Sequence, residues 1–349
     1  MSLRTACPGV AIRGFWAALV VVLCFSGCSS SSFHSPTTGA SASSPTAAIA
    51  GYVWDSRVQG LRPLSGTLGA AHLESPLPGT ALQSATPCPA HGLALGADTG
   101  GVFSIALPSG QPTRLGDAVS PDQQMTLSPS CANGLVYSPS HGSGLLITGL
   151  ASSPRVQSIA LRSSGPVSSA VISDSGAILL AAPNAKGTAS LEILSATGSA
   201  QALSFSVQKI GGIAFLPGAD SAIIADSAAN TVYLGKQLSS GPSFAAIAAS
   251  AQGVSNPRAV ATSADGHYAF VANGSGNNLL RIDLTSTGAP IAIACGCSPT
   301  ELIPLAGAAG FQITDAAAGL IFALNGDGPS PRTVFIPTDK VSAATGGAQ

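Results

Sequence analysis

A hairpin turn recurs at nearly constant spacing along this 349-residue chain, and the repeat restricts the possible folds more than any other feature. In each unit an apolar segment, a turn rich in Gly, Ser, Asp or Asn and a second apolar segment follow one another. The turns lie at 90–92, 132–134, 174–176, 219–221, 264–266 and 308–310. Their final residues are 42, 42, 45, 45 and 44 positions apart. Gly, Asn and Asp adopt the positive φ of tight hairpins at the lowest cost, which explains their place in the turns.

A unit of this length with four short strands is typical of a β-propeller blade, whose sheet packs against the neighbouring sheets. Six clear units occupy residues 86–338, and Gly51–Asp55 and Leu61–Leu64 read as two further strands before them. Dividing 50–338 by seven gives about 41 residues per blade, nearer the observed period than the value of about 48 for six. We therefore predict an all-β propeller of seven four-stranded blades over 50–338. The alternatives are six blades, or a β-sandwich, whose turns would not repeat every four strands.

Charged side chains make up only 8% of the chain, with 14 Lys and Arg against 15 Asp and Glu. A nucleic-acid-binding surface needs an excess of cations to neutralise phosphates, so we expect no nucleic-acid partner. The scarcity of charge also excludes a coiled coil or an amphipathic helical bundle, because the exposed faces of such helices are charged.

The N-terminus has the pattern of an export signal. Arg4 and Arg13 precede the apolar run 14–25, which is followed by Ser, Gly and Cys28. Twelve helical residues cover about 18 Å, whereas the hydrocarbon core of a bilayer is about 30 Å thick. The run is therefore too short for a membrane-spanning helix, and we predict that residues 1–27 are a signal peptide.

The sequence Phe-Ser-Gly-Cys at 25–28 resembles the lipobox of bacterial lipoproteins, in which the cysteine is diacylated and begins the mature chain. The resemblance implies a lipid on Cys28 and a membrane contact through that lipid. Ser29, in place of the Asp of an inner-membrane retention signal, implies the outer membrane of the cell envelope. The alternative is an ordinary secretory signal in which Cys28 is incidental. We expect 28–49, rich in Ser, Thr and Pro, to form a flexible tether and 339–349 to be a disordered tail.

One repeat unit carries a family resemblance. Residues 256–287 (NPRAVATSADGHYAFVANGSGNNLLRIDLTST) contain Asn-Pro-x-Ala, Ser-x-Asp-Gly, Tyr-Ala-Phe-Val-Ala-Asn and an Ile-Asp-Leu strand. This pattern resembles the repeats of YVTN-type, lactonase-like propellers, whereas the other units share only the turn and the strand spacing. The resemblance implies the propeller fold for 50–338 and adds a hydrolase to the candidate activities.

Known catalytic and phosphate-binding motifs are missing from the sequence, which contains no G-x-S-x-G, H-E-x-x-H, G-K-S/T or C-x-x-C. The histidines are isolated, without the spacing that places two ligands on one face. We therefore predict no catalytic residue, metal or cofactor. Acids recur near the hairpins, and capping of turn amides explains them at least as well as Ca²⁺ binding does. These acids are Asp98, Asp174, Asp226, Asp265, Asp283 and Asp315.

Three charged residues lie where the strands nearest the propeller axis should begin: Lys209, Arg258 and Glu301. At these positions they could face a central funnel and bind an anionic or polar ligand. The alternative is that they are solvated residues of the rim.

Four cysteines remain in the predicted domain after Cys28, and export permits disulfides. Cys88 and Cys131 each lie just before the hairpin turn of adjacent units, so we predict that they pair. Cys295 and Cys297 are separated by one glycine and form the second predicted pair, or a site for a soft metal. The alternative for all four is buried, reduced thiols.

These features lead to two candidate functions. The first is an envelope-anchored lipoprotein propeller that binds or assembles a protein or glycan partner through its loop faces. The second is a periplasmic, lactonase-like hydrolase, which needs acids, His and Arg converging on a wet pore. The small number of ionisable residues favours the binding module over the enzyme.

Overall fold

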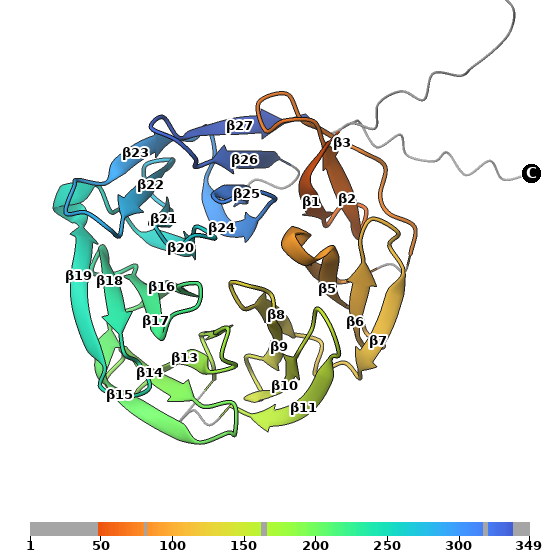
Figure 1. Cartoon of the computed structure of the whole chain (residues 1–349). Coiled ribbons are helices and arrows are strands. Elements are labelled where there is room, and N and C mark those ends of the chain that lie inside the picture. The colour runs from red at the N-terminus through yellow and green to blue at the C-terminus, as the bar shows by residue number, and fades with distance from the viewer. Residues whose placement is uncertain (1–47, 80–81, 162–165, 317–319, 338–349) are drawn as a thin grey trace, which may run out of the picture. The chain divides into compact units, whose positions relative to one another are not determined.

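The computed structural model describes residues 48–337, apart from 80–81, 162–165 and 317–319. These residues form seven antiparallel sheets arranged in a ring (Figure 1). The prediction of an all-β propeller with seven blades is therefore confirmed. The expected signal peptide (1–27), the lipid site Cys28 and the tail (339–349) lie outside the described residues, as does the expected tether (28–49) apart from its last two residues, of which Ile49 begins the first strand. No helix in the described part of the chain is long and apolar enough to cross a membrane.

The strands follow one another blade by blade. Blade 1 holds β1 (Ile49–Asp55), β2 (Gly60–Ser65) and β3 (His72–Leu73). Blade 2 holds β4 (Ser84–Cys88), β5 (Leu93–Ala97), β6 (Val102–Ala106) and β7 (Pro112–Gly116). Blade 3 holds β8 (Gln124–Leu127), β9 (Asn133–Ser138), β10 (Ser143–Thr148) and β11 (Arg155–Ala160). Blade 4 holds β12 (Ser169–Ile172), β13 (Ile178–Pro183), β14 (Ala189–Leu194) and β15 (Ala200–Val207).

The remaining blades repeat this order. Blade 5 holds β16 (Ile210–Phe215), β17 (Ser221–Asp226), β18 (Thr231–Lys236) and β19 (Ser243–Ala249). Blade 6 holds β20 (Pro257–Thr262), β21 (Tyr268–Asn273), β22 (Asn278–Asp283) and β23 (Ile291–Ala294). Blade 7 holds β24 (Pro299–Pro304), β25 (Gly310–Asp315), β26 (Ile321–Asn325) and β27 (Arg332–Ile336). Two 3₁₀ turns, η1 (Pro89–His91) and η2 (Ser250–Gln252), complete the described elements.

Blade 1 is smaller than the others, with three strands among the described residues. Its last strand, β3, is two residues long. Pro76 and Pro78 follow closely, and proline has no N–H to donate to a sheet, which explains why the strand ends early. The inner strands β24 and β4, from the blades on either side, contact each other directly.

The predicted hairpin turns join the first two strands of blades 2–7, and a serine stabilises several of them. In blade 6 the hydroxyl of Ser263 accepts a hydrogen bond from Tyr268 N (2.9 Å), and Gly266 takes a positive φ of 72°. In blade 4 the hydroxyl of Ser173 accepts one from Ala177 N (2.9 Å) in the same way. The recurring turn sequence therefore has a local physical cause, because each turn satisfies its own backbone groups.

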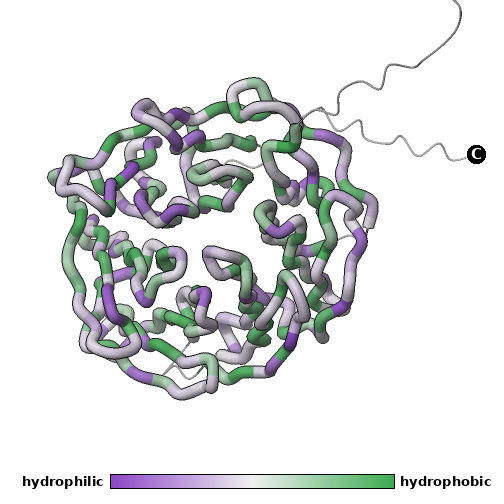
Figure 2. Tube along the Cα trace, viewed as in Figure 1, coloured by the Kyte–Doolittle hydropathy of each residue, from purple (hydrophilic) through white to green (hydrophobic). Residues whose placement is uncertain are grey.

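Seven buried apolar clusters occupy the seven spaces between neighbouring blades of the described structure. Between blades 4 and 5, for example, Leu191 packs in one cluster with Phe215 and Ile224. Figure 2 shows the apolar positions distributed around the whole ring. The hydrophobic core is therefore divided into seams between blades, and each blade depends on both neighbours to bury its two faces.

The seam between blades 7 and 1 closes the ring. Each described sheet consists of consecutive strands, so no sheet combines strands from both ends of the chain. Val53 and Leu305 instead pack in one apolar cluster. Ala306 N donates to Ala50 O (3.0 Å), and Gln312 Nε2 donates to Trp54 O (3.4 Å). Apolar packing and a few hydrogen bonds therefore hold the two ends of the ring together.

A buried ion-pair network stabilises blade 1. Asp55 is 3% exposed and accepts hydrogen bonds from Arg57 Nη2 (2.7 Å) and Arg62 Nη1 (3.3 Å). Arg62 Nε also donates to Glu74 O (2.7 Å), on the chain that follows β3. Burial acts to raise the pKa of Asp55, but the hydrogen bonds and charge of Arg57 and the hydrogen bond of Arg62 outweigh it and lower that pKa.

We expect Asp55→Asn to lower the free energy of unfolding at pH 7 by about 3 kcal/mol, because it removes the buried carboxylate that bonds the buried Arg62 guanidinium. The folded-state pKa of Asp55 is lowered, so the carboxylate stabilises the fold above the unfolded pKa of about 4 and loses this effect as the pH falls further. Urea unfolding should therefore show a smaller difference between wild type and variant at pH 3 than at pH 7. The exposed Asp327→Asn is the control, and an equal effect of both substitutions would contradict the role of Asp55.

Inner strands β16 and β20 approach each other so closely that only glycine fits at two positions. A Cβ on Gly211 would overlap the carbonyl oxygen of Pro257, and one on Gly212 would lie 2.9 Å from Val260 N. Both obstacles are backbone atoms, which cannot move aside as a flexible side chain would.

We expect Gly211→Ala to destabilise the protein by about 3 kcal/mol, because the added methyl group must push two inner strands apart. Gly241→Ala is the matched control, since a Cβ at that position meets nothing within 4 Å. Thermal and urea unfolding of both variants measure the difference. Equal stability of the two variants would show that the β16–β20 contact is not tight.

Candidate functional site

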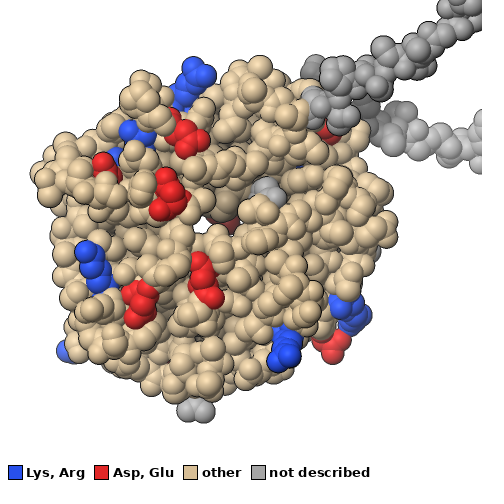
Figure 3. Space-filling model, in the orientation of Figure 1, with Lys and Arg blue, Asp and Glu red and all other residues tan. Residues whose placement is uncertain are grey.

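A channel of about 1010 Å³ runs through the centre of the ring. Its walls are the inner strands of blades 2–7, and Trp54 is the one residue that blade 1 contributes to the described lining. Figure 3 shows a small opening at this point, with few charged side chains on the visible face. The volume is in the range of cavities that hold a small molecule or a short segment of a larger one.

The two ends of the channel differ in chemistry. In blades 2–7 the inner strand begins on one face of the ring and ends at the hairpin turn of the other, whereas β1 begins beside the hairpin turn of blade 7. We call the starting end the polar mouth; it is lined by Gln123, Gln124, Ser168, Arg258, Thr300 and Glu301. We call the opposite end the apolar mouth; it is lined by Ala90, Pro129, Pro217, Ala264 and Ala308.

Arg258 and Lys209 occupy different environments. Arg258 lines the channel, is exposed to it, and lies over Gly274, where a Cβ would come 2.5 Å from the guanidinium Nε. Lys209 is exposed but is not part of the described lining. Its backbone is held by Asp226, whose Oδ1 accepts from Lys209 N (3.2 Å). The structure therefore brings only Arg258 of the two cations to the channel.

Glu301 is the second charged side chain of the channel wall. Thr314 Oγ1 donates a hydrogen bond to Glu301 Oε2 (3.4 Å). The carboxylate reaches the channel, yet the protein around it raises its pKa by desolvation, and the hydrogen bond from Thr314 opposes this only partly. No ion pair within 4.0 Å joins Glu301 to any described cation.

The neutral residues of the polar mouth were not singled out from the sequence. No sequence motif includes Gln123, Gln124, Ser168 or Thr300, and Trp54 belongs to no repeated motif. An alignment of the repeats would have found these positions. Pro257 pairs with Asn273, and Pro299 pairs with Asp315 in the same way, so the residues that follow the two prolines begin equivalent inner strands. The first residues of each inner strand are therefore the candidates for the polar mouth.

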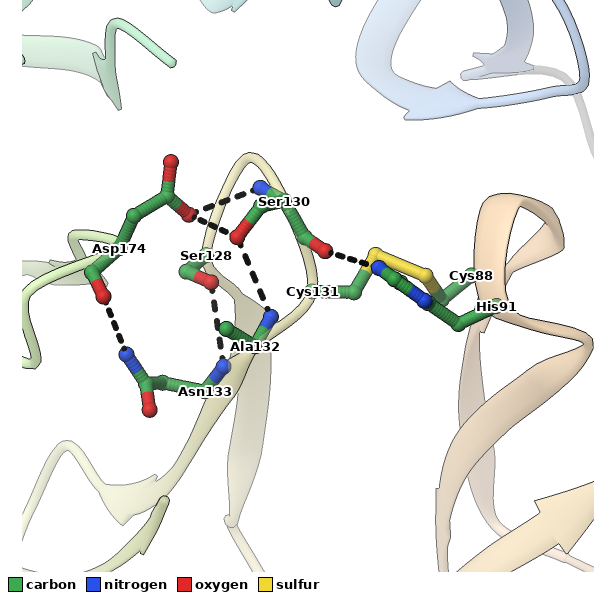
Figure 4. Close-up of a disulfide and its surroundings, with 8 residues drawn as sticks. All are labelled: Cys88, His91, Ser128, Ser130, Cys131, Ala132, Asn133 and Asp174. Atoms are coloured by element: carbon green, nitrogen blue, oxygen red, sulfur yellow. Dashed lines mark hydrogen bonds between the residues drawn. A yellow bond between two sulfur atoms is a disulfide. The ribbon is translucent and has the colours of Figure 1, made fainter. Parts of the chain in front are cut away.

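A disulfide joins blades 2 and 3 at the apolar mouth (Figure 4). Cys88 and Cys131 are bonded, with their Cα atoms 6.2 Å apart. Next to them, His91 Nε2 lies at hydrogen-bond distance from Ser130 O (2.8 Å). Both links cross the seam between the blades, so the turns on this rim are connected by covalent and polar contacts.

Asp174 extends these contacts to blades 4 and 5. Its Oδ1 accepts hydrogen bonds from Ser130 N (2.8 Å) and Ser130 Oγ (2.6 Å), and its Oδ2 accepts from Gly218 N (2.9 Å). Asn133 Nδ2 donates to Asp174 O (2.9 Å), as Figure 4 shows. Burial acts to raise the pKa of Asp174, but these hydrogen bonds outweigh it and lower that pKa. The Asp174 carboxylate therefore links the hairpin turns of blades 3, 4 and 5.

The second cysteine pair lies between β23 and β24. Cys295 and Cys297 are bonded, with their Cα atoms 5.0 Å apart. Both are buried in the apolar seam between blades 6 and 7, near Phe270 and Phe311. The two sulfurs are therefore part of a blade interface rather than of the channel wall.

The other acids singled out from the sequence accept hydrogen bonds from backbone amides, which is the capping alternative. Asp98 Oδ1 accepts from Gly100 N (2.7 Å), and Asp226 Oδ2 accepts from Gln208 N (2.6 Å). Hydrogen bonds from Thr285 lower the pKa of Asp283 to about 2. Within the described ranges no group of three or more His, Cys, Asp or Glu side chains is placed to hold a metal ion.

One Ser, His and Asp cluster joins the turn between β9 and β10 to Asp122, in the turn that precedes β8. Ser138 Oγ and Ser140 Oγ are each 2.9 Å from His141 Nδ1, and Asp122 Oδ1 is 4.0 Å from the same nitrogen. A catalytic triad needs the serine and the acid on opposite ring nitrogens. Here both serines and the acid lie on the side of Nδ1, so the cluster does not have the geometry of a triad. Hydrogen bonds from Ser120, Ser140 and Ser138 lower the pKa of Asp122, as expected for a carboxylate that stabilises a turn.

Comparisons with known proteins agree with the fold and go no further. No protein-family model and no curated protein matches the sequence. A functionally unknown protein from Desulfotomaculum acetoxidans DSM 771 is similar in structure, with a TM-score of 0.50, 14% identity and coverage of 83% of this chain and 99% of that one. A catalytically inactive variant of virginiamycin B lyase from Staphylococcus aureus with quinupristin has a TM-score of 0.52, 14% identity and coverage of 72% and 82%.

A third solved structure, the dihydro-heme d1 dehydrogenase NirN in complex with DHE, has a TM-score of 0.49 and 15% identity, and covers 75% of this chain and 57% of that one. At 14% identity the likeness to the first two structures shows a shared fold and no shared activity. The function therefore has to be argued from the channel of this chain.

We expect the Cys88→Ser, Cys131→Ser double variant to have a free energy of unfolding about 3 kcal/mol lower than that of the wild type. The reason is that the cross-link spans a sequence separation of 43 residues and restricts the unfolded chain. The Cys295→Ser, Cys297→Ser double variant is the control. Its cross-link spans a separation of two residues and should stabilise the fold much less through chain entropy. Urea unfolding with and without reductant measures both, and equal losses would contradict this account.

Proposed function

We propose that this chain is a lipid-anchored binding module of the bacterial cell envelope that holds a protein or glycan partner at the polar mouth. The observation that carries the proposal is the open channel of about 1010 Å³, whose two glutamines, Gln123 and Gln124, and two charged residues, Arg258 and Glu301, lie toward one end. Cavities with apolar walls and a few converging polar groups are the usual form of binding sites.

The anchoring part of the proposal rests on the sequence of residues 1–28 and on its lipobox resemblance. Ser29, which follows Cys28, supports the outer-membrane compartment of the envelope as the place where the partner is met.

A lactonase-like hydrolase is the second candidate, and Glu301 is the observation that favours it. A carboxyl group with a raised pKa in a channel can act as a general acid. Hydrolysis of this kind also needs a base or nucleophile nearby, and the described lining includes no other acid and no histidine. The composition of the wall therefore supports binding better than catalysis.

We expect Ser168→Trp to reduce capture of the envelope partner at least tenfold, because the indole fills the polar mouth where the Ser168 side chain is exposed. Ala245→Trp, on the exposed outer strand β19, is the matched control and should capture as wild type does. The measurement is a pull-down from envelope extract with the full lipidated chain. Protease-treated and glycosidase-treated extracts separate a glycan partner from a protein.

Equal capture by both tryptophan variants would contradict binding at the channel. The same preparations are assayed against a panel of lactones. If the wild type hydrolyses a lactone and Glu301→Gln does not, the hydrolase would be supported in place of the binding module.

A further inference from the structure

One glutamine of the channel wall is held in a fixed orientation by a buried tyrosine. Gln124 begins β8 and pairs with Tyr137 on β9. Tyr137 Oη accepts a hydrogen bond from Ala170 N (3.1 Å), on β12 of the next blade, and donates its own proton to Gln124 Oε1 (2.7 Å). The phenol is buried and has one proton, which a reversed amide would leave without an acceptor. The Nε2 group of Gln124 is therefore the end of the amide that is left for the channel.

This orientation is stable, and it sets Gln124 apart from the glutamine before it. Burial raises the pKa of Tyr137 to about 12, so the phenol keeps its proton at neutral pH. Gln123 uses both ends of its amide within the protein, since its Oε1 accepts from Val119 N (3.0 Å) and its Nε2 donates to Asp98 O (3.1 Å). Gln124 is exposed and lines the channel, and its Nε2 group has no partner among the described residues.

Two serine hydroxyls lie near this amide. Ser168 and Ser169 directly precede Ala170, whose N–H group bonds the Tyr137 hydroxyl. Both serines line the channel, and in the described structure neither hydroxyl has a hydrogen-bond partner. Through one phenol oxygen, the amide of blade 3 and the serines of blade 4 are brought to the same part of the polar mouth.

The wall on this side of the ring is rich in hydroxyl groups and carries no charge. Ser84, Thr86 and Thr126 also line it, and the described lining of blades 2–5 includes no Lys, Arg, Asp or Glu. The charged lining residues Arg258 and Glu301 belong to blades 6 and 7. A charged ligand would find no counter-ion on the side of blades 2–5. Hydroxyls both donate and accept, so they suit a polyhydroxyl ligand better than a peptide backbone, which has one donor and one acceptor per residue.

We propose that this side of the polar mouth binds a neutral glycan that carries acetamido groups, with an acetamido carbonyl oxygen accepting from Gln124 Nε2. Ser168 and Ser169 bind sugar hydroxyls, and Tyr137 is the positioning residue that orients the amide. The inference rests on the proposed binding function of the channel and names the class of its partner. A carbonyl oxygen only accepts, whereas a hydroxyl in its place would bring a proton that the Nε2 group cannot accept.

The first test compares two disaccharides. N,N′-diacetylchitobiose and cellobiose have the same rings and the same linkage, but cellobiose carries hydroxyls in place of both acetamido groups. Titration calorimetry on the full chain should show diacetylchitobiose bound at least tenfold more tightly than cellobiose. Equal affinities, or no binding of diacetylchitobiose, would overturn the proposal.

The second test removes the amide. Gln124→Met keeps the length of the side chain but has no N–H group, so it should weaken diacetylchitobiose binding at least tenfold. Gln157→Met, on the exposed outer strand β11, is the matched control and should bind as wild type does. Thermal unfolding of each variant shows that it is folded. Equal affinities of the two variants would overturn the role of Gln124.

The third test separates positioning from a structural role of Tyr137. Tyr137→Phe removes only the phenol oxygen and frees the amide of Gln124 to rotate, so the tenfold preference for diacetylchitobiose should fall below threefold. A purely structural role would weaken both disaccharides alike, and that result would overturn the positioning role. Gln124→Glu tests the same point with Tyr137 in place, because it substitutes a carboxylate oxygen for the N–H donors. It should abolish the preference, and a retained preference would contradict the proposal.

The outcomes separate this inference from the proposed function. Loss of partner capture in Ser168→Trp, together with no binding of diacetylchitobiose to wild type, would overturn the glycan and leave the binding module in place. Binding of diacetylchitobiose to wild type, together with equal partner capture by Ser168→Trp and Ala245→Trp, would do the reverse. The sugar site would then stand, and the captured partner would be held elsewhere on the ring.

Discussion

Packing between blades is the interaction on which the rest of this structure depends. Each sheet has two apolar faces, and neither can be buried within the blade itself. The seven seams bury these faces in pairs, and the last seam, between Val53 and Leu305, exists only when the ring is complete. The small closing blade fits the same logic, since Asp55 and its two arginine partners provide polar contacts where the sheet has fewer strands.

The ring also creates the site. Closing seven sheets around an axis leaves a space that the inner strands line, and their common direction gathers their first residues at one mouth. Arg258 and Glu301 both line the channel near that mouth, on the neighbouring inner strands β20 and β24. At the other mouth, the disulfide of Cys88 and the hydrogen bonds of Asp174 hold the turns in a fixed arrangement. A rigid wall of this kind supports selective binding because little conformational entropy is lost when a ligand enters.

Several features followed from sequence because they depend on local chemistry. The hairpin at Ser263–Gly266 closes through its own hydroxyl and a glycine of positive φ, so its pattern is visible in every unit that shares it. The capping role of Asp98 is local in the same sense, since its carboxylate accepts from Gly100 N, two residues along the chain. Such interactions are encoded within a few residues and repeat with the blades, which made the seven-bladed ring predictable.

The sequence by itself determined the repeat, the strand order and the positions of the turns, because backbone hydrogen bonding and turn geometry are satisfied within each unit. Only the tertiary structure decided that Arg258 and Glu301 share a channel while Lys209 stays outside it, and that Trp54 alone represents blade 1 in the wall. How much room the side chains of an inner strand have depends on how closely the neighbouring blade approaches. At Gly211 and Gly212 that approach leaves no room for a Cβ atom. That approach is set by packing around the complete ring, a long-range property that no single repeat contains.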